Sequence, residues 1–392
     1  MRPELKNVLC IKPTIRRSRL MLGFILIFFS ALAVRALYLQ GYDNIYKSVN
    51  QPWLSYTEKL RANRGKITDR RGVPLAISSS VQTVGASPAE ITITRAQKAK
   101  LAFLLNMTPE LLDKRLKPSE RDFIYLKRQV SPQKANEIAA LKIDGISFES
   151  EFKRYYPKGE VTAHVVGLTD IDEKGQEGLE LAYHDWLAGK PGKRFVYRDR
   201  ANNVIDQDPM KLSLPEKGRD LPLSIDLRLQ NSAFREIKKA VTENKAKSGS
   251  IVVLDAKTGE ILALANWPTY NPNNRRTYLP GKVRNLAVVD IFEPGSTLKP
   301  FSVAAAIEAG YVTPETKFDI GNGRFRVGNK EITDTHPKKT NLTVTEIIKV
   351  SSNVGSAQIA LGMPSEKLWQ IFSMVGFSNS PDSGFPGEAS GK

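Results

Sequence analysis

The feature that most constrains this chain is an apolar run near its start, Leu20 to Gln40, in which Arg35 is the one charged residue. A helix rises 1.5 Å per residue, so about twenty residues cover the roughly 30 Å hydrocarbon core of a bilayer. Six basic residues and one acidic residue precede the run, and such a bias keeps the N-terminus cytoplasmic. We therefore predict a basic cytoplasmic tail over residues 1–19, a transmembrane helix over residues 20–40 and an extracytoplasmic remainder.

A cleaved signal peptide is the competing interpretation, because Ala31-Leu32-Ala33 resembles a cleavage site. The apolar run continues past that site to Leu39, which favours a retained anchor. Arg35 lies near the far end of the run, where its side chain can extend to the interface beside Tyr38.

The net charge of +17 raises the possibility of a nucleic-acid partner. The basic residues are dispersed and no nucleic-acid-binding motif accompanies them, so we expect a solvated basic surface and no such partner. The single cysteine, Cys10, precedes the apolar run, and the three histidines, His164, His184 and His336, are far apart. We therefore expect neither an internal disulfide nor a metal site.

Residues 41–220 alternate short strands, turns and short helices. Residues 64–76 indicate a strand, a turn at Arg71-Gly72 and a second strand, and helices are indicated over residues 94–105, 109–116 and 131–141. Neither a Ser/His/Asp set nor a phosphate-binding loop is present in this stretch. We predict a non-catalytic pedestal domain here, with a polar, turn-rich link at residues 215–219 leading into a second domain over residues 221–392.

The second domain begins with a helix that Asp226 opens and that carries Leu227, Phe234, Ile237 and Val241 along one face. Two apolar strands follow over residues 251–254 and 260–265, and a turn joins them. Strands this apolar are typically buried on both faces.

A serine and a lysine one helical turn apart come next, in the segment Glu293 to Pro300. Pro294-Gly295 forces a turn, and an alanine-rich helix over residues 301–309 ends at Gly310. Ser296 and Lys299 therefore share one face, where the lysine can take the serine's proton if burial lowers its pKa. A helix N-terminus also stabilises developing negative charge. Alone, this spacing is more typical of a serine cap followed by a surface lysine.

Ser351-Ser352-Asn353 supplies the second motif. Thr343 and Glu346 form a capping box that opens a helix through residue 350, and a second helical stretch, residues 354–361, ends at Gly362. Ser351 and Asn353 thus fall at a break between helices, where side chains can point into a cleft. There Ser351 can relay protons, and Asn353 can accept a hydrogen bond from Lys299 and donate one to a substrate amide.

Both motifs resemble those of the class B penicillin-binding proteins, and specifically of the division-specific (septal) peptidoglycan D,D-transpeptidases. The resemblance covers nearly the whole chain from the apolar run onward. Beyond Glu293 to Pro300 and Lys349 to Gly355, it rests on Arg64 to Arg70, Phe123 to Val130, Arg154 to Pro157, Gly159 to His164 and Tyr270 to Asn274.

The resemblance implies an α+β fold: a transmembrane helix, a mixed α/β pedestal (dimerisation) domain, and the N-terminal part of a serine β-lactamase-like transpeptidase domain with helices around an antiparallel sheet. It implies that Ser296 attacks the D-Ala-D-Ala bond of a pentapeptide stem, with Lys299 as base. Ser351 and Asn353 would position protons and bind substrate. Acyl transfer of this kind needs no cofactor and no metal.

The third motif of this family, K-T-G, is spelled by Lys257-Thr258-Gly259. We reject this match, because it precedes Ser296 and lies in the turn between two strands, whereas the family places the motif on a strand after S-x-N. The sequence ends before such a strand, so we expect a truncated chain that neither cross-links stems nor forms a lasting penicillin adduct.

The resemblance also implies a single-pass inner-membrane protein with its bulk in the periplasm, at the division septum. Its implied partners are peptidoglycan stems, β-lactams bound covalently at Ser296, a membrane-embedded lipid II glycosyltransferase and other division proteins. An elongation-specific transpeptidase, a penicillin-sensing receptor and a non-catalytic division scaffold remain as alternatives.

Overall fold

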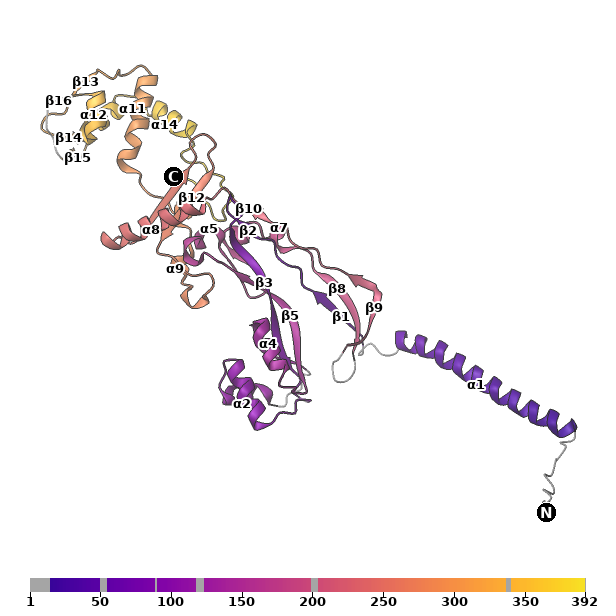
Figure 1. Cartoon of the computed structure of the whole chain (residues 1–392). Coiled ribbons are helices and arrows are strands. Elements are labelled where there is room, and N and C mark those ends of the chain that lie inside the picture. Colours follow the sequence, from indigo (N-terminus) through magenta and orange to yellow (C-terminus); the bar gives the residue numbers. More distant parts are fainter. Residues whose placement is uncertain are drawn as a thin grey trace, which may run out of the picture. The chain divides into compact units, whose positions relative to one another are not determined.

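The computed structural model describes residues 15–49, 55–88, 90–117, 123–198, 204–335 and 340–391 (Figure 1). Cys10, His336 and most of the predicted cytoplasmic tail lie outside these ranges. Contacts divide the chain into two units, Met1–Leu60 with Pro191–Pro215, and Arg61–Lys190 with Glu216–Lys392. Helices accompany mostly antiparallel sheets, which confirms the α+β class.

The first unit contains the long N-terminal helix and one sheet. Helix α1 spans Ile15–Val49, and its stretch Ile15–Tyr38 is long and apolar enough to cross a membrane, with none of its most apolar window buried. The transmembrane segment predicted over residues 20–40 lies within this helix. That the helix crosses a membrane stays a prediction. Strands β1 (Ser55–Leu60), β8 (Gly192–Arg198) and β9 (Val204–Ser213) form an antiparallel sheet in the order β1-β8-β9.

The second unit begins with a five-stranded sheet. Its strands run β10-β2-β3-β4, and β5 pairs with β3; they span Leu221–Pro222 (β10), Ile67–Thr68 (β2), Pro74–Ala86 (β3), Ile124–Val130 (β4) and Ile146–Tyr155 (β5). The turn predicted between β2 and β3 is present, and Asp69 closes it by accepting the backbone N–H groups of Arg71 and Val73.

Three capped helices cover this sheet, in the three segments where helices were predicted. They are α2 (Arg95–Leu104), α3 (Pro109–Leu116) and α4 (Pro132–Ala139), which Thr94, Thr108 and Ser131 cap in turn. Their buried faces pack with β3 and β4 in one apolar core that includes Leu101 and Leu126. Side-chain capping satisfies backbone N–H groups that would otherwise lack partners, and it fixes the residue at which each helix begins.

A buried ion network joins β5 to the short elements that follow it: η1 (Gly159–Val161), α5 (Ala163–Val166), β6 (Leu168–Thr169), β7 (Gly175–Glu177), α6 (Gly178–Ala182) and α7 (His184–Ala188). Glu180 on α6 accepts from Arg64 Nε at 2.6 Å and from Arg154 Nε at 2.7 Å, and all three side chains are at most 2% exposed. Two guanidinium groups and one carboxylate therefore share a site without solvent, where each charge depends on its partners.

The next elements form a helix-covered hairpin. Helix α8 spans Leu227–Glu243 with Asp226 as its cap, and β11 (Gly249–Leu254) pairs antiparallel with β12 (Ile261–Trp267). The expectation that both strands are buried on both faces is confirmed for most of β12 and wrong for β11. Helix α8 packs on one face of β11, whereas Val252 and Leu254 on its other face are 46% and 56% exposed. Helix α10 (Leu286–Val289) covers only part of that face: it packs on Leu264, the β12 partner of Val252, and leaves Val252 and Leu254 exposed.

The remaining elements carry the two sequence motifs. They are η2 (Arg275–Thr277), α9 (Pro280–Val283), α10 (Leu286–Val289), η3 (Gly295–Leu298), α11 (Lys299–Glu308), β13 (Lys317–Asp319), β14 (Arg324–Val327), β15 (Lys330–Thr333), β16 (Asn341–Thr343), α12 (Val344–Val350), α13 (Asn353–Leu361) and α14 (Ser365–Met374). Helices α11, α12 and α13 share one apolar core around Ala306, Ile347 and Val354.

The predicted border at residues 220 and 221 falls inside continuous structure. Strand β10, just after the predicted link, pairs in parallel with β2 of the predicted pedestal. Leu227 and Tyr270 pack in the same core as Ile67 and Leu75. The two predicted domains therefore share a sheet and a core, and their border stays a prediction.

The buried network yields a stability prediction. Glu180→Gln should lower the free energy of unfolding by about 3–5 kcal/mol, because the buried Arg64 and Arg154 would both lose the carboxylate that they bond. Urea unfolding of the full chain in detergent micelles measures this change.

Glu260→Gln is the matched control, since Glu260 pairs with Arg70 at 3.4 Å while both side chains are well exposed. It should change the free energy of unfolding by less than about 1 kcal/mol. Equal effects of the two substitutions would contradict this account of the network.

Candidate active site

Ser296 lies in a tight turn that leads directly into α11. Gly295 starts the 3₁₀ turn η3 with φ +61°, and the Thr297 hydroxyl donates to the Pro294 carbonyl at 2.6 Å. Three residues complete one 3₁₀ turn, so Ser296 and Lys299 lie on the same side of the segment. Helix α11 itself begins at Lys299, and Gly310 follows its end with φ +72°, as predicted.

The break between α12 and α13 is built from local hydrogen bonds. The predicted capping box is present: Thr343 and Glu346 exchange side-chain and backbone hydrogen bonds at the start of α12. Ser351 ends α12 in a left-handed conformation, φ +56°, and the Ser352 hydroxyl caps α13 by accepting from Gly355 N at 2.9 Å. A non-glycine residue with positive φ is uncommon and directs the chain sharply into the next helix.

Lys299 connects the two motifs. Its Nζ donates to the Ser351 carbonyl at 2.5 Å, to Ser351 Oγ at 3.1 Å and to Asn353 Oδ1 at 2.7 Å. An ammonium group has three N–H donors, so these three oxygens use its full capacity. The structure therefore brings together three of the four predicted site residues, from α11 and from the break between α12 and α13.

Ser296 is the fourth, and it is not bonded to the other three. Its side chain is exposed, and within the described ranges Ser296 Oγ has no hydrogen-bond partner. Catalytic hydrogen bonds are often long in a ligand-free site and tighten when substrate binds. The arrangement thus holds the amine one turn from a free hydroxyl.

Two opposing effects act on the Lys299 amine. Partial burial lowers the pKa of Lys299 below its ordinary value, while the negative charge of Asp334 acts in the opposite direction. A lowered pKa increases the fraction of neutral amine, which is the form able to accept a proton from a serine. Burial is thus the larger of the two effects, and it favours a base.

Asp334, directly after β15, is a residue that the sequence interpretation missed. Its carboxylate accepts from Ser352 Oγ at 2.7 Å, from Val354 N at 3.0 Å and from Asn353 N. The neighbouring Thr333 carbonyl accepts from Asn353 Nδ2 at 2.9 Å. A carboxylate bonded to the first backbone N–H groups of a helix is stabilised by them and fixes the helix start. No local pattern marks this residue, because its role depends on β15 packing beside α13.

The K-T-G sequence lies in a turn, as predicted. Asp255 accepts from the backbone N–H groups of Lys257 at 2.8 Å and Thr258 at 3.1 Å, and Gly259 follows with φ +75°. Lys257 is exposed. These contacts show that the three residues form a turn, which explains their identities without a catalytic role.

Two family descriptions match the chain. The penicillin-binding protein transpeptidase domain matches residues 249–392, and the penicillin-binding protein dimerisation domain matches residues 59–223. The first match contains all four predicted site residues.

Curated relatives align over nearly the whole chain. Probable peptidoglycan D,D-transpeptidase PenA of Neisseria meningitidis serogroup A is 39% identical, over 97% of this chain and 66% of that protein. Peptidoglycan D,D-transpeptidase FtsI of Escherichia coli K12 is 40% identical, over 96% and 64%. Probable peptidoglycan D,D-transpeptidase PbpC of Pseudomonas aeruginosa is 38% identical, over 96% and 67%. The chain thus spans about two thirds of the length of these relatives.

Solved structures share the fold. A peptidoglycan synthetase from Bifidobacterium adolescentis aligns with a TM-score of 0.61 at 24% identity, over 86% of this chain and 66% of that one. A penicillin-binding protein, PBP2, in complex with MreC from Helicobacter pylori aligns with a TM-score of 0.67 at 23% identity, over 86% and 68%.

The electrostatics of the site yield a prediction for Asp334→Asn. The asparagine can still accept backbone hydrogen bonds but carries no charge, so the pKa of Lys299 should fall further below its ordinary value. Competitive labelling with acetic anhydride, which reacts with neutral amines, measures this shift when the Lys299 peptide is quantified by mass spectrometry across pH. The variant's Lys299 should become reactive at lower pH.

Lys257, which is exposed in its turn, is the internal reference for this experiment. Asp319→Asn is the control variant, because the Asp319 carboxylate accepts from Gly321 N and, among the described residues, makes no hydrogen bond with Lys299. An unchanged or upward-shifted Lys299 profile in Asp334→Asn would show that Asp334 does not act on the amine through its charge.

Proposed function

The chain belongs to the class B penicillin-binding proteins, and on that premise we propose that it is a serine-type peptidoglycan D,D-transpeptidase. The observation that carries the proposal is the Lys299 ammonium, which donates to Ser351 and Asn353 one turn from the free hydroxyl of Ser296. A nucleophile, a base and groups that orient the base are what acyl transfer requires.

The proposed reaction has two steps. Neutral Lys299 takes the proton of Ser296 Oγ while that oxygen attacks the carbonyl between the two D-alanines of a pentapeptide stem. The terminal D-alanine leaves as its amine accepts a proton, and the stem remains as an ester on Ser296. The amine of a neighbouring stem then attacks this ester, forming the cross-linking amide and restoring the serine hydroxyl.

The other two site residues act on this sequence in different ways. Ser351 Oγ accepts from Lys299, so it can pass a proton between the amine and the leaving group. Asn353 Oδ1 holds the amine, and its Nδ2 donates to the Thr333 carbonyl, which fixes the orientation of the amide. We propose that Asp334 secures both residues by bonding the start of α13. The same hydroxyl of Ser296 would attack a β-lactam ring and remain acylated.

The cellular setting is a separate part of the proposal. A septal role is supported by the family segments along the chain and by the similarity to FtsI and PenA. The apolar helix α1 supports a single-pass anchor in the inner membrane, with its N-terminus cytoplasmic and the site periplasmic. Proposed partners are a lipid II glycosyltransferase in the membrane and other division proteins.

Substitution of the nucleophile and the base tests the chemistry. The test protein is a chimera in which residue 392 continues into the C-terminal part of the E. coli relative FtsI. Ser296→Ala should abolish covalent labelling by a fluorescent penicillin, because it removes the hydroxyl that forms the ester. Lys299→Ala should slow labelling by about 10²–10⁴, the usual contribution of a positioned base.

Lys257→Ala is the matched control, since it removes an exposed lysine that lies outside the two motifs, and it should label at the parent rate. Mass spectrometry of the digested adduct identifies the acylated residue. An adduct on any residue other than Ser296 would refute the assignment.

A further inference from the structure

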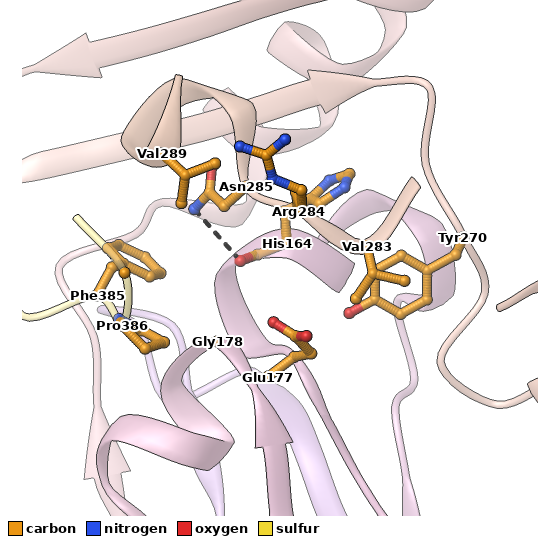
Figure 2. A pocket seen from close by; sticks show the side chains of 11 residues that line it. His164, Glu177, Gly178, Tyr270, Val283, Arg284, Asn285, Val289, Phe385 and Pro386 are labelled. Carbon is orange, nitrogen blue, oxygen red and sulfur yellow. Dashed lines mark hydrogen bonds between the residues drawn. The ribbon is translucent and has the colours of Figure 1, made fainter. Parts of the chain in front are cut away.

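A cavity of about 280 Å³ is lined by residues that lie outside the two sequence motifs (Figure 2). Its walls come from α5, from β7, from the chain after β12, from the segment between α9 and α10, and from residues 385–387. The residues that matter here are His164, Glu177, Tyr270, Arg284, Asn285 and Phe385. Ligand sites are commonly about 300–1,000 Å³, so this volume suits a compact ligand.

Glu177 presents an unpaired carboxylate to this cavity. Figure 2 shows its carboxylate in the space between Phe385 on one side and Val283 and Tyr270 on the other. In the described part of the chain, no hydrogen bond or ion pair engages this side chain. Burial raises the pKa of Glu177, and no cation offsets that effect. The cavity thus contains a partly buried carboxylate that has no hydrogen-bond or ion-pair partner among the described residues.

The nearby guanidinium does not provide that partner. Arg284 Nη2 donates to Asp290 Oδ1 at 2.9 Å, so its charge is already paired. In Figure 2 the guanidinium points away from Glu177. With Arg284 and Asp290 compensating each other, the charge left at the cavity is the negative charge of Glu177.

The remaining polar groups offer acceptors. His164 Nε2 lies 2.9 Å from the Lys282 carbonyl, which can only accept, so Nε2 carries the proton. Burial lowers the pKa of His164 and keeps the ring neutral, which leaves Nδ1 as an acceptor. The Tyr270 hydroxyl donates to the Ala163 carbonyl at 3.0 Å, so its free capacity is again a lone pair.

Asn285 is already satisfied at both ends of its amide. Its Nδ2 donates to the His164 carbonyl at 3.4 Å, drawn as the dashed line in Figure 2, and its Oδ1 accepts from Asn266 Nδ2 at 2.8 Å. The hydrogen-bonding groups that Glu177, His164 and Tyr270 leave unused are therefore all acceptors. A complementary ligand must bring N–H donors and positive charge.

We propose that this cavity is a binding site for a compact organic ammonium, whose N–H groups bond the carboxylate of Glu177 and whose apolar body packs on Val283 and Phe385. An aromatic ring also attracts a cation over its face, and Tyr270 and Phe385 both line the space. Such a ligand contacts residues 164–178 and residues 270–387 together, so it would stabilise the packing between these two stretches.

Three small probes with the same apolar body test the proposal on the full chain in detergent micelles: benzylammonium, benzyl alcohol and benzoate. Isothermal titration calorimetry with a micelle blank measures each affinity. Benzylammonium should bind at least tenfold more tightly than the other two, because the cavity offers acceptors and negative charge. Benzoate binding as tightly as benzylammonium would overturn the proposal without any variant.

Substitution locates the site. Glu177→Gln should weaken benzylammonium binding at least tenfold, and Glu177→Asp, which keeps the charge, should restore part of the affinity. Glu243→Gln is the control, since Glu243 is exposed at the end of α8, and it should bind as the parent does. Unchanged affinity in a folded Glu177→Gln, checked by its thermal unfolding midpoint, would also overturn the proposal.

Discussion

One ammonium group organises the candidate active site. Lys299 Nζ donates to two oxygens of Ser351 and to Oδ1 of Asn353, so it joins the start of α11 to the break between α12 and α13. The start of α13 is held in place as well, because the carboxylate of Asp334 accepts hydrogen bonds from Ser352 and Val354. A lysine has a flexible stem and loses rotamer freedom when it is fixed. The three acceptors on Ser351 and Asn353 offset that loss and hold the amine in one position.

The rest of the second unit supports that geometry through buried contacts. The core shared by α11, α12 and α13 fixes the distance between the two motifs, and Gly355 is required there because a Cβ atom would lie 2.6 Å from the Ile347 side chain. Earlier in the chain, Glu180 compensates two buried arginines. One apolar core also spans both matched family regions. The cavity at Glu177 is lined by residues from both of these regions. A ligand bound there would therefore stabilise the contacts between the two predicted domains.

Features encoded by neighbouring residues were predictable from the sequence. The capping box of Thr343 and Glu346 uses two residues three positions apart and opens α12 as predicted, and the helices predicted over residues 109–116 and 131–141 begin at Pro109 and Pro132. The K-T-G turn was equally local. The features that the sequence did not predict depend on tertiary contacts. The exposure of one face of β11 depends on what packs against it, and the role of Asp334 depends on β15 lying beside α13. The network around Glu180 joins residues 116 positions apart. No periodicity or motif reports such contacts.

A double-mutant cycle between Lys299 and Asn353 tests the central claim, that the amine and the amide form one unit. Lys299→Met and Asn353→Leu, alone and combined, are compared by the free energy of unfolding of the full chain in micelles. Because the pair is partly exposed, we predict a coupling energy of about 0.5–1.5 kcal/mol. The control cycle of Lys299→Met with Asp319→Asn should be additive within about 0.5 kcal/mol. Additivity in both cycles would contradict the account, since it would mean that Lys299 does not hold the break between α12 and α13.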